Sequence, residues 1–184
     1  MEEARKRRRE LVFSFVIVFV SLLIFTANLY DFLLFHALQE IFTIVIAFSI
    51  FVIAWSSRRY IDNAFLFIIG VAYLFVGGLD LGHMLTFEGR DMGVKYDADM
   101  AAQFWVAARY LEAASFIGAF IFLAGDSKKR IAMIIGNSYR FLFAYAGLFA
   151  LIFLSITYLK IFPQAFIEGY GMSPFRVYSE YLIS

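Results

Sequence analysis

The sequence predicts an all-α fold, a bundle of helices that cross a lipid bilayer several times. Of its 184 residues, 62% are hydrophobic and 20% are aromatic, whereas soluble domains are roughly half apolar. The apolar residues gather in runs of about 20, the length that a helix needs to cross the hydrocarbon core. Backbone amides in lipid must bond within their own segment, so spans this apolar are expected to be helices. The alternating pattern of a membrane β-barrel is absent from the sequence.

Five apolar runs are long enough to cross the bilayer, and a sixth is shorter. The complete spans are Leu11–Leu29, Leu38–Trp55, Ala64–Leu85, Phe104–Ala124 and Phe141–Leu159. The sixth begins near Phe175 and reaches only Ser184, so we expect the chain to stop inside its last helix. We therefore divide the sequence into a basic segment, residues 1–10, and a transmembrane domain, residues 11–184. The first run is longer than the roughly 7–15 apolar residues of a signal peptide.

The distribution of Lys and Arg predicts the orientation of these spans. Five basic residues lie in Arg5–Arg9, two in Arg58–Arg59 and four in the segment from Lys128 to Arg140, which makes eleven on one side. Only four lie in the segments on the opposite side. They are Arg90, Lys95, Lys160 and Arg176. Because cytoplasmic loops carry the excess of Lys and Arg, we expect a cytoplasmic N-terminus in a multi-pass protein of the cell inner membrane. The longest outer loop is then Thr86–Ala102.

Composition and motifs exclude several classes of function. The chain has no cysteine, so it has no disulfide, thiolate metal site or catalytic thiol. The one strongly basic run directly precedes an apolar span, which indicates the lipid bilayer and not a nucleic acid as its partner. Motifs of serine hydrolases, P-loop enzymes and zinc proteases are also absent from the sequence. We therefore predict that the chain is not an enzyme.

Ionisable residues inside the spans are the best candidates for function, because they are costly in lipid and usually functional. His36 and Glu40 are four residues apart in the second span, and Asp80 and His83 are three apart in the third. Each pair therefore shares one helix face. The alternating topology places both pairs in the outer half of the membrane. The only two histidines of the chain are thus expected at similar depth on consecutive helices.

The fourth span adds further polar residues at this level. Gln103, Trp105, Arg109 and Glu112 all lie in its outer part. Trp105, Arg109 and Glu112 follow a four-then-three spacing, which predicts one stripe along the helix. We predict that these four residues, together with His36, Glu40, Asp80 and His83, line a ligand-binding pocket.

Three interpretations of this polar cluster remain open. His36, Glu40, Asp80 and His83 are candidate ligands for a transition metal such as Zn, Cu or Fe. The two histidines could instead ligate haem b. In the third interpretation the cluster only fixes helix packing, with Arg109 paired to Glu112 or Asp80, since buried charges must be paired. The glycines of the third span, Gly70, Gly77, Gly78 and Gly82, are expected to let it approach its neighbours closely.

Several blocks of the sequence have the pattern of a known family. They are His36-x-x-x-Glu40, Ala54–Arg59, Gly70–His83, Gln103–Glu112 and Gly171–Tyr181. Together they resemble the membrane-associated sensor domains, specifically the third type of the MASE group. The resemblance covers nearly all of residues 11–184, and the block Gln103–Glu112 is its most specific part.

The resemblance implies an N-terminal input domain of a bacterial or archaeal signalling protein. Such domains precede histidine kinase, diguanylate cyclase or sensory PAS modules, as in two-component systems, and they perceive a ligand in or near the membrane. We therefore expect a sensor that relays its signal to a cytoplasmic output module absent from this chain, with a homodimer as the plausible assembly. The alternatives are a membrane metalloenzyme acting on a lipid-like substrate, with a metal-activated water, and a haem-binding membrane protein.

Overall fold

The computed structural model describes the chain except for a few segments. The described residues are 2–60, 64–87, 97–123, 133 and 136–183, with the backbone alone for 2–4, 23–24 and 27–30. The chain divides into two compact units, Met1–Phe42 and Thr43–Ser184, and each is described by itself. The predicted cytoplasmic cluster Lys128–Arg130 and most of the predicted outer loop, residues 88–96, lie outside the described residues.

The first unit contains helix α1 (Glu2–Tyr30) and the start of helix α2 (Phe32–Ser57). Asp31 separates the two helices and caps the second one. Its Oδ1 accepts hydrogen bonds from the N–H groups of Leu33 at 2.8 Å and Leu34 at 3.3 Å. Such a cap satisfies amides that the first turn of a helix leaves without partners. Helix α2 therefore begins at Phe32 and not at Leu38, where the apolar run begins.

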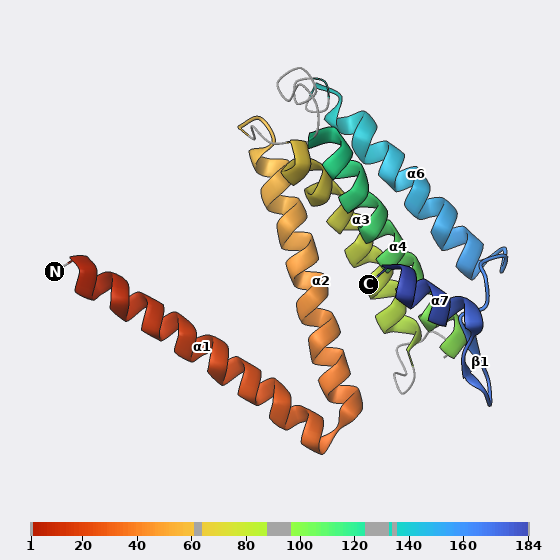
Figure 1. Ribbon diagram of the computed structural model, residues 1–184, viewed down its shortest axis with the longest axis horizontal. Coiled ribbons are helices and arrows are strands. Elements are labelled where there is room, and N and C mark those ends of the chain that lie inside the picture. Colours follow the sequence, from red (N-terminus) through yellow and green to blue (C-terminus); the bar gives the residue numbers. More distant parts are fainter. Residues whose placement is uncertain (1, 61–63, 88–96, 124–132, 134–135, 184) are drawn as a thin grey trace. The chain divides into compact units, whose positions relative to one another are not determined.

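The second unit continues α2 and adds three long helices, α3 (Ala64–Thr86), α4 (Ala98–Leu123) and α6 (Ser138–Thr157) (Figure 1). A short hairpin of β1 (Phe166–Ile167) and β2 (Gly171–Met172) follows, and then helix α7 (Pro174–Ile183). The hairpin pairs Phe166 with Met172 in antiparallel register and is a small addition to the predicted all-α fold. Gly169 and Gly171 adopt φ of 82° and 90° in its turn, a conformation that glycine adopts without strain.

Four of the described helices are long and apolar enough to cross a membrane. They are Phe32–Ser57, Ala64–Thr86, Ala98–Ile121 and Ser138–Thr157. The sequence-based boundaries of the third span are thus correct to one residue, whereas α4 begins at Ala98, six residues before Phe104. An all-α bundle with several membrane spans is therefore confirmed. The first of the five complete spans, Leu11–Leu29, lies within α1, and its crossing of the bilayer stays a prediction.

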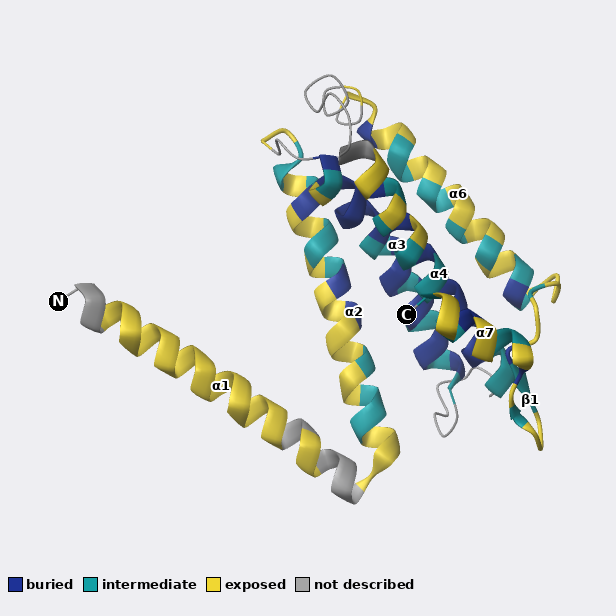
Figure 2. Ribbon diagram, in the orientation of Figure 1, coloured by how far each residue is buried: buried dark blue, intermediate teal, exposed yellow. Residues whose placement is uncertain are grey.

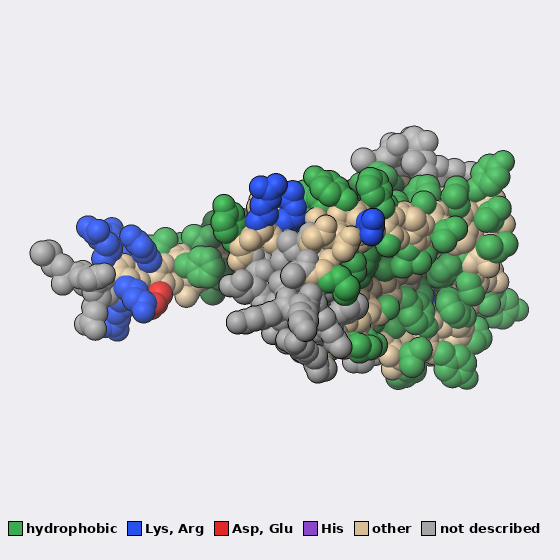
Figure 3. Space-filling model, turned by 90° about the horizontal axis from the view of Figure 1, so that it is seen from above, with side chains coloured by type: hydrophobic (Ala, Val, Ile, Leu, Met, Phe, Trp, Pro, Cys, Tyr) green, Lys and Arg blue, Asp and Glu red, His purple; other side chains and the backbone are tan. Residues whose placement is uncertain are grey.

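Helix α3 is the central helix of the second unit. Of its most apolar stretch 61% is buried, against 6% for α6, and Figure 2 shows this contrast along the two helices. Phe67, Val71 and Leu79 are completely buried against the neighbouring helices. The outward side chains are also apolar, and Figure 3 shows a largely hydrophobic surface with few basic groups on this unit. A surface of this kind fits a lipid environment.

The glycines of α3 allow close approach to three different helices. A side chain at Gly70 or Gly77 would meet Ala54 or Ala47 of α2. At Gly78 it would meet Phe149 of α6, and at Gly82 the ring of Phe104 of α4. The predicted role of these glycines in close packing is therefore confirmed, as expected where small residues let helix backbones approach in membranes.

We expect Gly70→Ala to lower the free energy of unfolding by about 1–3 kcal/mol, because its new methyl group would overlap the Ala54 Cβ and force the two helices apart. The matched control is Gly147→Ala in α6, where no atom lies within 4 Å of the added methyl group. Reversible unfolding in mixed detergent micelles measures both variants. Equal effects of the two substitutions would contradict the close packing of α2 and α3.

Candidate functional site

A network of charged and polar side chains connects α3 and α4 within their membrane-spanning lengths. Arg109 of α4 donates from Nη2 to both carboxylate oxygens of Asp80 on α3, at 2.8 and 2.9 Å. Its Nη1 donates to Glu112 Oε2 at 2.7 Å. The Tyr73 hydroxyl of α3 donates to the other oxygen of Glu112, at 2.7 Å. Four side chains from two helices therefore form one continuous chain of hydrogen bonds.

The burial of this network makes its pairing energetically important. The side chain of Asp80 is only 4% exposed, whereas those of Arg109 and Glu112 are 26% and 22% exposed. A carboxylate this deeply buried is tolerated only when a partner compensates its charge. Arg109 pairs with both of the carboxylates that the packing interpretation named as alternatives. Both oxygens of Asp80 are engaged in this pairing.

The sequence forms this network through simple helix periodicity. Tyr73 and Asp80 are seven residues apart, two turns along one face of α3. Arg109 and Glu112 are three apart and adjacent on α4. Of the predicted stripe Trp105, Arg109 and Glu112, the last two therefore contact α3.

His83 lies one turn after Asp80 and is buried, with 6% of its surface exposed. Its Nδ1 is 2.8 Å from the carbonyl oxygen of Ala101 in α4. A carbonyl only accepts hydrogen bonds, so Nδ1 carries the proton and donates. When the ring is neutral, Nε2 carries its lone pair, the arrangement in which a histidine can ligate a metal or accept a proton.

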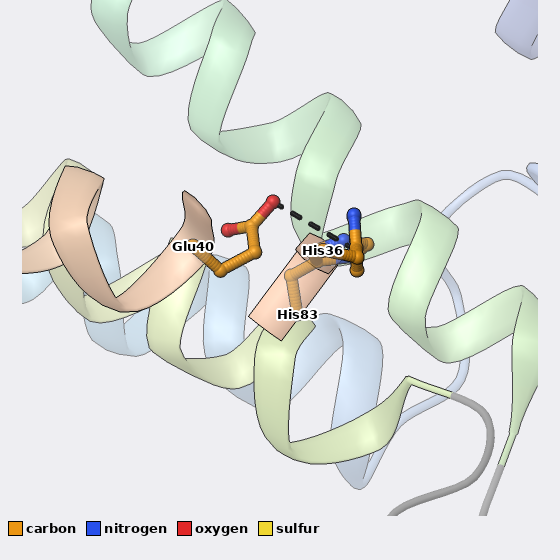
Figure 4. A group of neighbouring side chains, drawn as sticks. All are labelled: His36, Glu40 and His83. Atoms are coloured by element: carbon orange, nitrogen blue, oxygen red, sulfur yellow. Dashed lines mark ion pairs between the residues drawn. The ribbon is translucent and has the colours of Figure 1, made fainter. Parts of the chain in front are cut away.

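His36 and Glu40 belong to the first unit. The His36 Nε2 and the Glu40 Oε1 are 3.9 Å apart on adjacent turns of α2 (Figure 4). This is a long ion pair that needs a protonated imidazole. The spacing of four residues thus brings these two side chains together, as expected. Because His36 lies in the first unit and His83 in the second, a common pocket for both stays a prediction.

Gln103 lies near the start of α4 and contacts the loop that follows α6. Its Nε2 donates to Asp99 Oδ2 at 3.0 Å and lies 3.4 and 3.3 Å from the carbonyl oxygens of Phe162 and Pro163. Asp99 Oδ1 accepts from the N–H groups of Ala165 at 2.7 Å and Phe166 at 2.8 Å. We call Asp99 and Gln103 the loop clasp, because together they fix residues 162–166 to α4.

Trp105 contacts α7 and is not in the Arg109 network. The guanidinium of Arg176 lies over its ring at 5.2 Å, and Arg176 also donates to Glu180 at 2.9 Å. Nearby, the Tyr110 hydroxyl donates to Ser179 Oγ at 3.0 Å. These contacts attach α7 to α4. The predicted ligand residues of α4 thus divide into a loop clasp, an α7 contact and an ion-pair network.

Two important residues, Tyr73 and Asp99, were not among the predicted site residues. Tyr73 lies two turns before Asp80, so helix spacing alone could have placed it on the same face. Asp99 is four residues before Gln103. The prediction placed Asp99 in the loop Thr86–Ala102, so helix spacing was not applied to this pair. The start of α4 at Ala98 makes the two side chains neighbours.

Comparison with known proteins identifies a family. Residues 27–184 match the family model described as a membrane-associated sensor domain. No curated protein and no solved structure matches the chain. The match covers every described site residue of both units.

We expect Arg109→Gln to lower the free energy of unfolding by about 3–5 kcal/mol, because it leaves the buried Asp80 carboxylate without its cation. The control is Arg176→Gln, which removes the pair with the more exposed Glu180 and the contact with Trp105 but leaves no deeply buried charge, and it should cost about 1–2 kcal/mol. Unfolding in mixed micelles provides the measurement. The double variant Asp80→Asn with Arg109→Gln should recover part of the loss. If Arg109→Gln were no more harmful than its control, the network would not stabilise the fold.

Proposed function

The chain belongs to the membrane-associated sensor domain family, and from this premise we propose that it is the input domain of a signalling protein that perceives its signal through polar groups inside the membrane. The family is a sensor family and not a catalytic one. The signal is a ligand, a metal or a cofactor-linked change. It acts at the outer-half residues of α3 and α4, with His36 and Glu40 of α2 as further candidates.

The buried Arg109 network is the observation that carries this proposal. Ionisable residues inside membrane spans are rarely kept without a function. Moving α4 along α3 would separate Arg109 from Asp80 and leave a buried charge unpaired. The two helices therefore favour discrete arrangements over continuous sliding. A ligand that binds one arrangement better than another shifts the equilibrium between them, which is the requirement for a sensor.

The charge distribution supports an output module on the cytoplasmic side. Basic residues border the ends of the helices where α2 ends and α6 begins, with Arg58 and Arg59 after α2 and Arg140 in the first turn of α6. By the positive-inside rule this end is cytoplasmic, in the inner membrane. A histidine kinase or diguanylate cyclase module on that side would receive the signal, and a homodimer is the assembly that we propose by analogy.

The tautomer of His83 favours a more specific version of the proposal. With Nδ1 donating to Ala101, the Nε2 of a neutral His83 has the lone pair that a metal or haem iron requires. Such a group would make the sensor responsive to a gas, a metal ion or a redox change. His36 is the second imidazole that could serve in the same way, from its own helix.

We expect protein purified from membranes to contain a transition metal or a haem with a Soret absorption band, and His83→Ala to lose it. His36→Ala tests the second imidazole separately, and Arg176→Gln is a control on α7, at a residue outside the predicted metal ligands. Elemental analysis and an absorption spectrum measure the content. Full retention by both histidine variants contradicts the ligand assignment. A wild-type protein without metal or haem contradicts this version and leaves the Arg109 network as the sensing site.

Orientation can be tested with single cysteines, because the chain contains none. Tyr60 and Tyr170 are well matched, with 86% and 91% of their surface exposed. We expect a membrane-impermeant maleimide to label Tyr170→Cys in intact cells, and Tyr60→Cys only after the inner membrane is permeabilised. The reverse pattern would place the N-terminus outside. Equal labelling of both in intact cells would contradict a membrane between them.

A further inference from the structure

The second unit contains a polar cavity at the end where α4 begins and α6 ends. Its volume is about 260 Å³. The polar side chains that line it are Asp97, Asp99, Gln103, Lys160 and Gln164, and Ile156 contributes apolar surface. These residues come from α4, from the end of α6 and from the loop that follows it. The cavity is thus assembled by tertiary structure and is not a feature of one helix end.

Acidic groups of this cavity are held in fixed positions. Asp97 Oδ1 accepts from the Met100 N–H at 3.0 Å. Asp99 accepts from two backbone amides of the loop and from Gln103, as described above. Carboxylates that are already positioned lose little freedom when a ligand arrives, which favours binding.

Lys160 supplies a charge of the opposite sign. Within the described part of the chain it forms no ion pair with either aspartate, although all three line the same cavity. Its φ of 51° makes it the one described non-glycine residue in the left-handed region. That conformation suits glycine or asparagine better than lysine, and strained residues cluster at functional sites. A role of the Lys160 side chain in the cavity would account for this backbone conformation.

We propose that this cavity binds a small solute that carries both an ammonium and a carboxylate group, the chemistry of a free α-amino acid. The ammonium would be recognised by Asp97 and the amide oxygens of the glutamine side chains, and the carboxylate by Lys160. The volume is slightly below the roughly 300–1,000 Å³ of pockets for drug-sized ligands, which suits a small solute. A bare metal ion is disfavoured, because Lys160 lines the cavity and Asp99 is already engaged by three donors.

Occupancy of this cavity can reach the rest of the unit through the loop clasp. Asp99 and Gln103 line the cavity and also hold residues 162–166. The chain then continues into the hairpin and α7, which is attached to α4 through Arg176 and Trp105. A ligand that donates a hydrogen bond to the Asp99 carboxylate would therefore compete with the loop amides that already donate to it. This use as a signal rests on the proposed sensor function, whereas the binding itself does not.

The experiment titrates purified protein in detergent with L-alanine and L-lysine and follows binding by calorimetry. Putrescine, which has only amines, and succinate, which has only carboxylates, serve as ligand controls. We expect saturable binding of at least one amino acid and much weaker binding of the controls. Asp97→Asn keeps the helix cap, and Lys160→Asn suits the left-handed backbone, so both variants should fold. Each should weaken binding about tenfold or more, because each removes a charge-assisted hydrogen bond.

Glu168→Gln is the matched control variant, since Glu168 is an exposed acid of the hairpin turn and lies outside the cavity lining, and it should bind like the wild type. The proposal is overturned if neither amino acid binds up to about 10 mM, far weaker than specific recognition requires. It is also overturned if both cavity variants bind as tightly as the wild type, or if putrescine or succinate binds as tightly as the amino acids. A protein that binds no amino acid but shows the expected cysteine labelling leaves the membrane-sensor proposal intact.

Discussion

The pairing of Arg109 with Asp80 is the constraint on which the second unit depends. A carboxylate with 4% exposure in an apolar helix requires a fixed cation, and the cation comes from the neighbouring helix. The pairing also restricts the rotation of α4 about its own axis, because Nη2 reaches both Asp80 oxygens only when the guanidinium group faces α3. Glu112 and Tyr73 then follow at set positions. The remaining contacts of α4 are therefore aligned by one ion pair.

This ion pair in turn requires close packing around α3. Gly82, two residues after Asp80 on that helix, leaves room for the ring of Phe104 from α4. About one turn earlier, Gly77 leaves room for α2 and Gly78 for α6. Without hydrophobic driving force between helices in lipid, close van der Waals contact and hydrogen bonds must hold them together. The glycines and the buried charges thus both hold α3 in fixed contact with its neighbouring helices.

Sequence reasoning was accurate where hydropathy and helix spacing decide the structure. The bounds of α3, the shared face of Asp80 and His83 and the close approach at Gly70 followed from composition and period. It failed where a cap or a loop decides. The Asp31 cap makes α2 begin at Phe32. The first turn of α4 contains polar residues, and hydropathy does not detect a helix that extends beyond its apolar run. The separate partners of Trp105 and Arg109 depend on α7, whose position a single-helix spacing rule cannot give.

Successive turns of α4 bond to different parts of the unit, and this order explains how one helix could integrate a signal. Asp99 and Gln103 hold the loop, Trp105 contacts α7, Arg109 pairs with α3, and Ser115 receives the Tyr145 hydroxyl of α6 at 2.9 Å. A rotation of α4 that frees one of these contacts also strains the others. The bonds therefore favour a collective change over independent local ones. Collective switching between discrete packings is how small shifts at one end of a bundle reach the other.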